Sequence, residues 1–417
     1  MNISKLGGVV FLGAGVLVLG LAFSRETVKA QTNTPDFTVV NNDPKLDAGR
    51  PSLVLTTDNV PIIAFIETVN GVYNAFVKRW NGKTWERLGA GSLNLEKKFN
   101  SFDVILKLDQ NDTPVVAWTE RSNINLGKAS GPGKIYVARW TGKSWQQFGS
   151  SPSKSKNAAP DNPILALDAR GYPFLGFSEL SPDGNVDDFM VKRWDGKGWL
   201  VIDKGWLSAD MSDSSRSRDI GVTQTGTAIL AYSRAYFVPG VGRSDFNVFA
   251  GTWTGKVWSA WGGKSLNLDT NHYAGMISMK LNNQNQPVIA WAEANKGFDV
   301  SVKRFDGKDW QPFGRTVNGE TGAASNPKIA LDTNGNPTVA WIESTMVDNV
   351  VVRTWNGEAW ESVGRDIKIN PKNNADSCSI VVDIDGNPMI AWREGLGKSH
   401  RVYIKRFDGQ AWVALGQ

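Results

Sequence analysis

A phrase of two aromatic residues around a glycine recurs along this chain and constrains its fold more than any other feature. One copy reads RFDGKDWQPFG, from Arg304 to Gly314. In every copy a glycine lies three residues before a tryptophan, another aromatic lies five residues before it, and successive copies are 50 to 60 residues apart. Such a period is typical of solenoids, propellers and other arrays. The seven tryptophans are Trp85, Trp145, Trp199, Trp258, Trp310, Trp360 and Trp412.

Each repeat holds four short runs that are typical of strands. The runs are rich in Val, Ile and Trp and are separated by turns of Gly, Asn and Asp. The Asn-Gly and Asp-Gly steps favour tight hairpins, because both residue types tolerate positive φ. We therefore predict an all-β fold, a seven-bladed β-propeller with four antiparallel strands per blade, with the aromatic pair packed across each outer hairpin. In the sixth repeat the runs are PKIALD, PTVAWIE, NVVVRTW and WESVG, within residues 327–364.

The N-terminus reads as an export signal. Lys5 precedes an apolar stretch from Leu6 to Phe23, and Ala30 is a small residue at a plausible cleavage point. We predict a signal peptide over residues 1–30 and a secreted or periplasmic/extracellular protein; the alternative is an uncleaved anchor that would tether the chain to a membrane. Residues 31–50 form a lead-in with an extra strand at residues 37–40, which either pairs with the last blade or caps an edge. The propeller then covers 51–417.

Charge and cysteine content exclude several classes of protein. The formal net charge is only +5 over 417 residues and no basic stripe is concentrated, so nucleic acid is not a predicted partner. The single cysteine, Cys378, permits no internal disulfide and is expected to be a small buried residue. The run DIDGN (383–387) resembles the start of a calcium loop, but its glycine comes too early and no closing Glu follows. We predict no metal and no cofactor.

The hairpin phrase resembles the W-[DN]-G-x-x-W lines of seven-bladed bacterial lectin propellers, which bind fucose and related sugars. The fourth copy, GTWTGKVWSAWGG from Gly251 to Gly263, is the closest match. The phrase is also similar to the Asp-box hairpin of sialidase-like propellers, although that box has one residue between its Asp and Gly and here Asp306 and Gly307 are adjacent. The resemblance covers nearly all of residues 37–417. It implies the propeller fold and a carbohydrate or cell-surface glycan as partner; no catalytic motif of the sialidases is present.

Long, variable connections follow the second and fourth strands of each repeat, and in a propeller these gather on one face. Variable loops on a rigid scaffold are where binding usually occurs. A repeated acid at the end of the second strand points to the same face. It could form an electronegative ring for a cation or sugar, or each carboxylate could accept backbone N–H groups of a neighbouring loop. The acids are Glu67, Glu120, Glu179, Glu293, Glu343 and Glu394.

The fourth repeat departs most from the pattern, so we place the candidate ligand site there. It has Arg instead of Glu at the end of its second strand, then an insert with aromatic residues, and one of the two histidines in the next long loop. Aromatic faces beside cationic and polar groups are typical of a sugar site; the alternative is a loop packed on its own side chains. The predicted ligand-binding residues are Arg234, Tyr236, Arg243, His272, Tyr273 and Trp206, the one tryptophan outside the repeat pattern.

These features predict a secreted, lectin-like, carbohydrate-binding propeller, and we assign no catalytic residues. One alternative is a sialidase-like glycoside hydrolase or lyase, which needs two neighbouring acids outside the repeat. Asp187 and Asp188 are the only such adjacent pair. The other alternative is a cell-surface protein-interaction scaffold with a broad apolar loop face.

Overall fold

A computed structural model describes the propeller region of the chain. The described residues are 38–122, 133–153, 160–180, 187–202, 217–237, 244–261, 264–295, 297–319, 323–365, 367–397 and 399–415. The chain divides into two units, Met1–Pro35 and Asp36–Gln417. The predicted signal peptide lies outside the described residues. Within the described ranges, all regular structure is β-strand, and no helix is long and apolar enough to cross a membrane.

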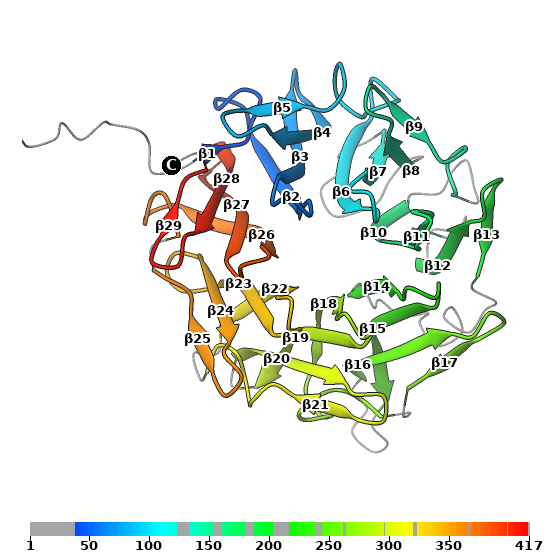
Figure 1. Cartoon of the computed structure of the whole chain (residues 1–417), viewed down its shortest axis with the longest axis vertical. Helices are drawn as coiled ribbons and strands as arrows, with labels where there is room; N and C mark the ends of the chain where they lie inside the picture. Colours follow the sequence, from blue (N-terminus) through cyan, green and yellow to red (C-terminus); the bar gives the residue numbers. More distant parts are fainter. Residues whose placement is uncertain are drawn as a thin grey trace, which may run out of the picture. The chain divides into compact units, whose positions relative to one another are not determined.

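The strands form seven sheets arranged in a ring (Figure 1), which confirms the predicted seven-bladed β-propeller. Blade 1 consists of β2 (Ala48–Leu55), β3 (Pro61–Val69), β4 (Val72–Trp80) and β5 (Trp85–Arg87). Blade 2 consists of β6 (Asn100–Leu108), β7 (Pro114–Arg121), β8 (Gly133–Trp140) and β9 (Trp145–Gln147). Blade 3 consists of β10 (Pro160–Leu167), β11 (Pro173–Leu180), β12 (Asp187–Trp194) and β13 (Trp199–Val201). Blade 4 consists of β14 (Arg218–Val222), β15 (Ala228–Phe237), β16 (Ser244–Trp253) and β17 (Trp258–Ala260).

The remaining blades repeat the same antiparallel order. Blade 5 consists of β18 (Ala274–Leu281), β19 (Pro287–Asn295), β20 (Gly297–Phe305) and β21 (Trp310–Pro312). Blade 6 consists of β22 (Ala324–Leu331), β23 (Pro337–Glu343), β24 (Asn349–Trp355) and β25 (Trp360–Ser362). Blade 7 consists of β26 (Asn374–Val382), β27 (Pro388–Leu396), β28 (Ser399–Phe407) and β29 (Trp412–Val413). In each blade the first strand lies nearest the centre of the ring in Figure 1.

Both ends of the chain close the ring. The extra strand, β1 (Thr38–Val39), pairs antiparallel with β28, which β29 also pairs. Of the two possibilities open from the sequence, the lead-in therefore pairs with the last blade. The Lys78 ammonium of blade 1 binds the carbonyls of Val40 and Asn41 at 2.7 and 3.1 Å, which fixes the lead-in against the first blade as well.

The recurring aromatic phrase is the outer hairpin of each blade, as predicted. The two aromatic rings pair across the hairpin in all seven blades, with ring centroids 5.2 to 5.8 Å apart. Four tryptophans of the second strands are fully buried between blades, where they fill the widest part of the core. These are Trp118, Trp291, Trp341 and Trp392. The described core consists of seven hydrophobic clusters, each shared by two neighbouring blades.

The hairpin turns use their Gly and Asp differently from the expectation. Gly307 has a φ of 101°, but Asp306 is not in the left-handed region, so only the glycine uses positive φ. The Asp306 carboxylate instead accepts the backbone N–H groups of Lys308 and Asp309, both at 2.8 Å. These hydrogen bonds lower the pKa of Asp306 to about 2. Side-chain capping of a four-residue loop therefore shapes this turn.

Candidate functional site

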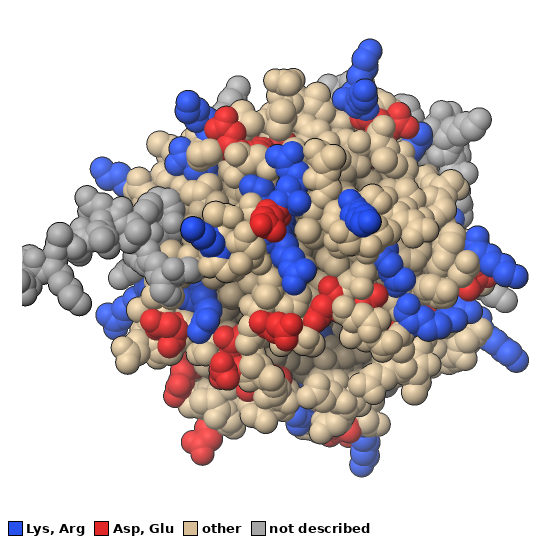
Figure 2. All heavy atoms as spheres, turned by 45° about the horizontal axis from the view of Figure 1, so that its top comes forward, with Lys and Arg blue, Asp and Glu red and all other residues tan. Residues whose placement is uncertain are grey.

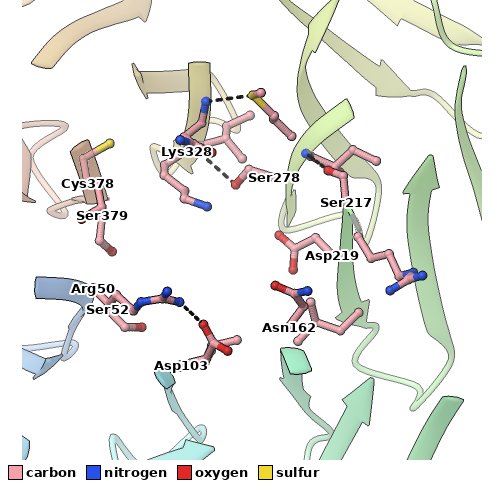
Figure 3. Close-up of a pocket in the computed structure, with 18 of the residues that line it drawn as sticks. Arg50, Ser52, Asp103, Asn162, Ser217, Asp219, Ser278, Lys328, Cys378 and Ser379 are labelled. Atoms are coloured by element: carbon pink, nitrogen blue, oxygen red, sulfur yellow. Dashed lines mark hydrogen bonds and ion pairs between the residues drawn. The ribbon is translucent and has the colours of Figure 1, made fainter. Parts of the chain in front are cut away.

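The inner strands surround a cavity of about 670 Å3 on the axis of the ring. Each inner strand begins on the face where the long connections lie, which we call the loop face, and ends at a short turn on the opposite face. All seven inner strands contribute lining residues, and side chains from several of them face a common space in Figure 3. Alternate residues of these strands point inward, because the side-chain period of a strand is two.

A β-bulge marks the loop-face mouth of this cavity. The pairing of the first two strands shifts register near the start of the inner strand in six of the described blades. Four residues at the equivalent bulge position have left-handed backbone, with φ between 48° and 55°. Such a conformation is uncommon for any residue except glycine, and bulges are a usual means of re-aiming a side chain. The four residues are Arg50, Asn162, Met276 and Asn326.

A network of four charged groups lies at the mouth across blades 1, 2 and 3. Arg50 pairs with Asp103, and Arg121 pairs with Asp161 at 2.5 Å. Burial raises the pKa of Asp103, the charge of Arg50 acts in the opposite direction, and the neighbouring Asp161 carboxyl raises it further. The Arg50 side chain is 58% exposed, so it reaches solvent at the cavity mouth.

A second cavity of about 670 Å3 adjoins the first over blades 1, 2, 6 and 7. Its wall includes Tyr73 and Arg393, and the Arg393 guanidinium lies 2.9 Å from the Nδ1 atom of His400. The same Nδ1 is 3.0 Å from an oxygen of Asp47, and Arg393 also pairs with Asp376. Gly49 permits this arrangement, because a Cβ atom there would lie 2.6 Å from the Cδ atom of Arg393.

The repeated glutamates hold loops in place, as the second of the two hypotheses states. Glu394 accepts the backbone N–H groups of Ile369 and Asn370 at 3.1 and 2.8 Å and the indole N–H of Trp392 at 2.9 Å. Glu67, Glu120 and Glu293 likewise accept two backbone N–H groups from the preceding connection. These carboxylates are buried, so they do not form an open electronegative ring.

The structure brings part of the predicted blade-four site to the cavity. Tyr273 lines the axial cavity, and its ring contacts Phe246 and Phe298 edge-on, at centroid distances of 5.7 and 6.0 Å. Arg234 lies in β15 with its guanidinium 4.6 Å from the ring centre of Phe249, within its own blade. His272 is 3.7 Å from Asp269 on the loop face and is half-exposed, but it does not line the cavity.

Three other predicted residues are not placed by the structure. Trp206 and Arg243 lie outside the described residues. Tyr236 belongs to β15, paired with Asp245 of β16, so the start of the insert extends the strand; its side chain is not described. The paired acids Asp187 and Asp188 begin β12, and their side chains are also outside the described set.

Sequence reasoning missed the charged groups around the axis. The strand runs were correct, and Lys107 alternates with the buried Leu106, so this inward-facing charge could have been read from the alternation. Arg50 and Asp103 lie in bulges, where the alternation breaks. Cys378 is buried, as expected, and burial raises the pKa of its thiol to about 12. Across the described residues, no group of three or more His, Cys, Asp or Glu side chains could hold a metal ion.

The comparisons agree that this chain is a seven-bladed β-propeller protein. It is 14% identical to a polysaccharide lyase described as an ulvan lyase, with a TM-score of 0.55 over 88% of this chain and 95% of that one. It is 9% identical to the polysaccharide lyase Uly1, with a TM-score of 0.53 over 92% and 94%. The β-propeller domain of the trilobed protease from Pyrococcus furiosus is 11% identical, with a TM-score of 0.50 over 88% and 96%. At these identities the likeness shows the fold alone. No family model and no curated protein matches the chain.

Proposed function

We propose that this protein is a secreted, lectin-like propeller that binds an acidic carbohydrate at the loop-face mouth of its axial cavity. Two propellers of similar fold are polysaccharide lyases, and the ulvan lyase has been solved bound to -[GlcA(1-4)Rha3S]-, an acidic sugar repeat. These relatives are distant, so the proposal depends on the residues of this cavity rather than on their names. The fucose preference implied by the lectin resemblance is not part of it.

The observation that carries this proposal is that Arg50 and Tyr273 line the same cavity. Arg50 offers an exposed guanidinium, which can bind a carboxylate or sulfate in a bidentate manner. Tyr273, flanked by Phe246, offers an aromatic surface held by its neighbours. An acidic sugar can use both kinds of contact, one for its charged group and one for its ring.

A glycan array that includes uronic-acid and sulfated oligosaccharides tests this proposal with the purified full-length protein. The informative variants are Arg50→Asn and Tyr273→Leu. Asparagine suits the left-handed backbone of position 50, because Asn162 and Asn326 occupy the equivalent bulges with the same conformation. Saturable binding that either variant weakens at least about tenfold supports the site, since one charge-assisted contact contributes about 1.5–3 kcal/mol.

The matched control is Lys308→Ala, because Lys308 is exposed on an outer hairpin far along the blade from the mouth. Binding that survives both mouth variants, while His272→Ala abolishes it, would move the site to the loop of blade 5. No binding to any glycan would contradict the lectin proposal and favour a protein-interaction scaffold. The exposed large apolar side chains on the described loop face are scattered over different blades; they are Leu95, Leu268, Met346 and Leu396.

A second candidate function is β-elimination in a uronic-acid polysaccharide. In that reaction a base removes the proton next to the carboxylate, the bond to the leaving sugar oxygen breaks while an acid gives that oxygen a proton, and an unsaturated sugar forms. The second cavity supports it because Tyr73 and Arg393 both line that cavity, which places a phenol that can transfer a proton on the same wall as a cation; His400 contacts Arg393 but does not line the cavity. Ultraviolet absorbance of the unsaturated product, absent in Tyr73→Phe, is the measurement that decides between lyase and lectin.

Hydrolysis by two carboxylates fits this site poorly. Glycosidases of that type need one carboxyl group as a proton donor and a second as a base or nucleophile. At the cavity mouth Asp103 is paired with Arg50 and Asp161 with Arg121. Both acids are therefore already engaged by arginines rather than free for those roles.

A further inference from the structure

We propose that the axial cavity holds a binding site for a tetrahedral oxyanion, a sulfate or phosphate group, below the loop-face mouth. The site is formed by Lys107, Lys280 and Lys328, which we call the lysine cluster. It does not depend on the proposed carbohydrate function, because it involves other residues and its ligand can be tested alone.

The topology of the ring brings the three lysines together. In the strand register, Lys107 is opposite Val115, the second residue of β7. Lys280 is likewise opposite Val288, the second residue of β19. The two lysines therefore lie at the same height along the axis of the ring. Lys328 pairs with Ala340 and lies one inward-facing position nearer the loop face. All three side chains line the same cavity, from blades 2, 5 and 6.

The charge of this lining is strongly unbalanced. Among the described lining residues, five side chains are cationic and two are anionic. Asp103 is paired with Arg50 at the mouth. Asp219 uses its two oxygens to accept the backbone N–H groups of Ile220 and Met279, at 2.9 and 2.8 Å. The outer surface differs, because basic and acidic side chains are interspersed on the face in Figure 2.

The repulsion within the lysine cluster is visible in Lys280. The charge of Lys107 is the largest cause that lowers the pKa of Lys280 to about 8, followed by burial, and Lys328 acts in the same direction. Asp219 raises this pKa without restoring it. The thiol of Cys378 supplies no negative charge, because burial raises its pKa to about 12. A bound anion would relieve this repulsion.

Three serine hydroxyls around the cavity can donate a hydrogen bond to a ligand. The Ser52, Ser278 and Ser379 Oγ atoms accept the backbone N–H groups of Leu106, Ile329 and Leu53 in the next blade, at 2.9, 3.2 and 2.9 Å. Each hydroxyl therefore has its own proton left for the cavity that it lines. Figure 3 shows these three serines facing the space that Lys328 also faces.

Three ammonium groups and several hydroxyl donors match a ligand with two negative charges and four acceptor oxygens. Sulfate and phosphate have this chemistry, whereas chloride offers one charge and no array of oxygens. The group could be a free ion or an ester on a sugar, since the cavity of about 670 Å3 exceeds the size of the ion.

The test measures binding of sodium sulfate, and separately sodium phosphate, to the full-length protein by calorimetry and by thermal midpoint. Sodium chloride at equal ionic strength is the reference, because sulfate also stabilises proteins in general by exclusion from their surfaces. We expect a saturable stabilisation by sulfate that Lys280→Gln and Lys107→Gln each weaken at least about tenfold. Lys308→Gln, an exposed lysine on an outer hairpin, should leave it unchanged.

The outcomes separate the two sources of the ligand. Tighter binding of glucose 6-sulfate than of inorganic sulfate identifies an ester, the reverse identifies a free ion, and glucose alone should not bind. A stabilisation that sodium chloride reproduces, or one equal in wild type and both cavity variants, overturns the site. Both variants remove a repelled charge and should fold, and their circular dichroism and melting without sulfate confirm this. A negative glycan array would leave the sulfate result intact, so failure of either proposal is distinguishable.

Discussion

Replacing Lys280 by methionine should stabilise the protein at neutral pH. Lys280 is held among Lys107 and Lys328 in the cavity, and its pKa is lowered from 10.5 to about 8. Each pKa unit corresponds to about 1.4 kcal/mol, so the charged lysine costs the native state up to about 3.5 kcal/mol. Methionine has a similar length without the charge, and it leaves the other two lysines less repelled.

The stability difference between Lys280→Met and the wild type should depend on pH in a defined direction. Below about pH 8 the lysine is charged in the folded and unfolded chains, so the full penalty applies to the wild type. Between about 8 and 10.5 the folded chain loses the proton first, and wild-type stability rises relative to Lys280→Met. Above about 10.5 both states are neutral at this position and the difference vanishes.

The assay is urea denaturation followed by tryptophan fluorescence from pH 7 to pH 10.5, in buffers free of sulfate and phosphate. Lys308→Met, which alters an exposed lysine, is the control and should change little at any pH. A gain for Lys280→Met that stays the same across this range would refute the electrostatic reasoning. So would the absence of any gain at pH 7.

Three further predictions concern the frame of the ring. Trp360→Phe should cost about 1 kcal/mol more than Trp310→Phe in denaturation, because the Trp360 indole N–H donates to the Phe313 carbonyl at 2.7 Å, whereas that of Trp310 has no partner among the described residues. Equal losses would contradict the role of that hydrogen bond. Removing residues 1–40 should lower stability by at least about 2 kcal/mol, since Val40 is fully buried between blades 7 and 1; unchanged melting would show that β29 alone closes the ring. Cys378 should resist thiol reagents in the native protein and react once urea unfolds it, because it is buried with its pKa raised to about 12; rapid native labelling would contradict this.

The fold could be predicted because its information is local and repeated. The two aromatics of each outer hairpin are five residues apart, and they pack on each other in every blade. This contact lies within one hairpin and needs no residue from another blade. The second-strand tryptophans and the glycine turns repeat for the same reason. Where the local chemistry was read wrongly, as for positive φ at Asp306, the blade still formed, since the carboxylate caps the turn instead.

The residues of the candidate site were predicted only in part. They were chosen because the fourth repeat differs from the other six, and such a difference does not show where a side chain points. Tyr273 was singled out in this way and does line the cavity. Arg234 stands out equally in the sequence, yet it stacks on Phe249 of its own blade. Arg50 was not singled out, although it lies at the mouth. Its position depends on a bulge in the inner strand, which the sequence alone does not reveal.

The sequence by itself determined the number of blades, the four strands of each and the face on which the variable loops gather. The number of blades equals the number of repeats, while the four strands and the loop face follow from the pattern within each repeat. Only the tertiary structure decided which charges meet at the axis. Lys107, Lys280 and Lys328 belong to different blades and occupy positions that the repeat does not conserve, so nothing local relates them. They become neighbours because closing the ring turns every inner strand toward one shared space, and there their repulsion is set by distance across the ring rather than along the chain.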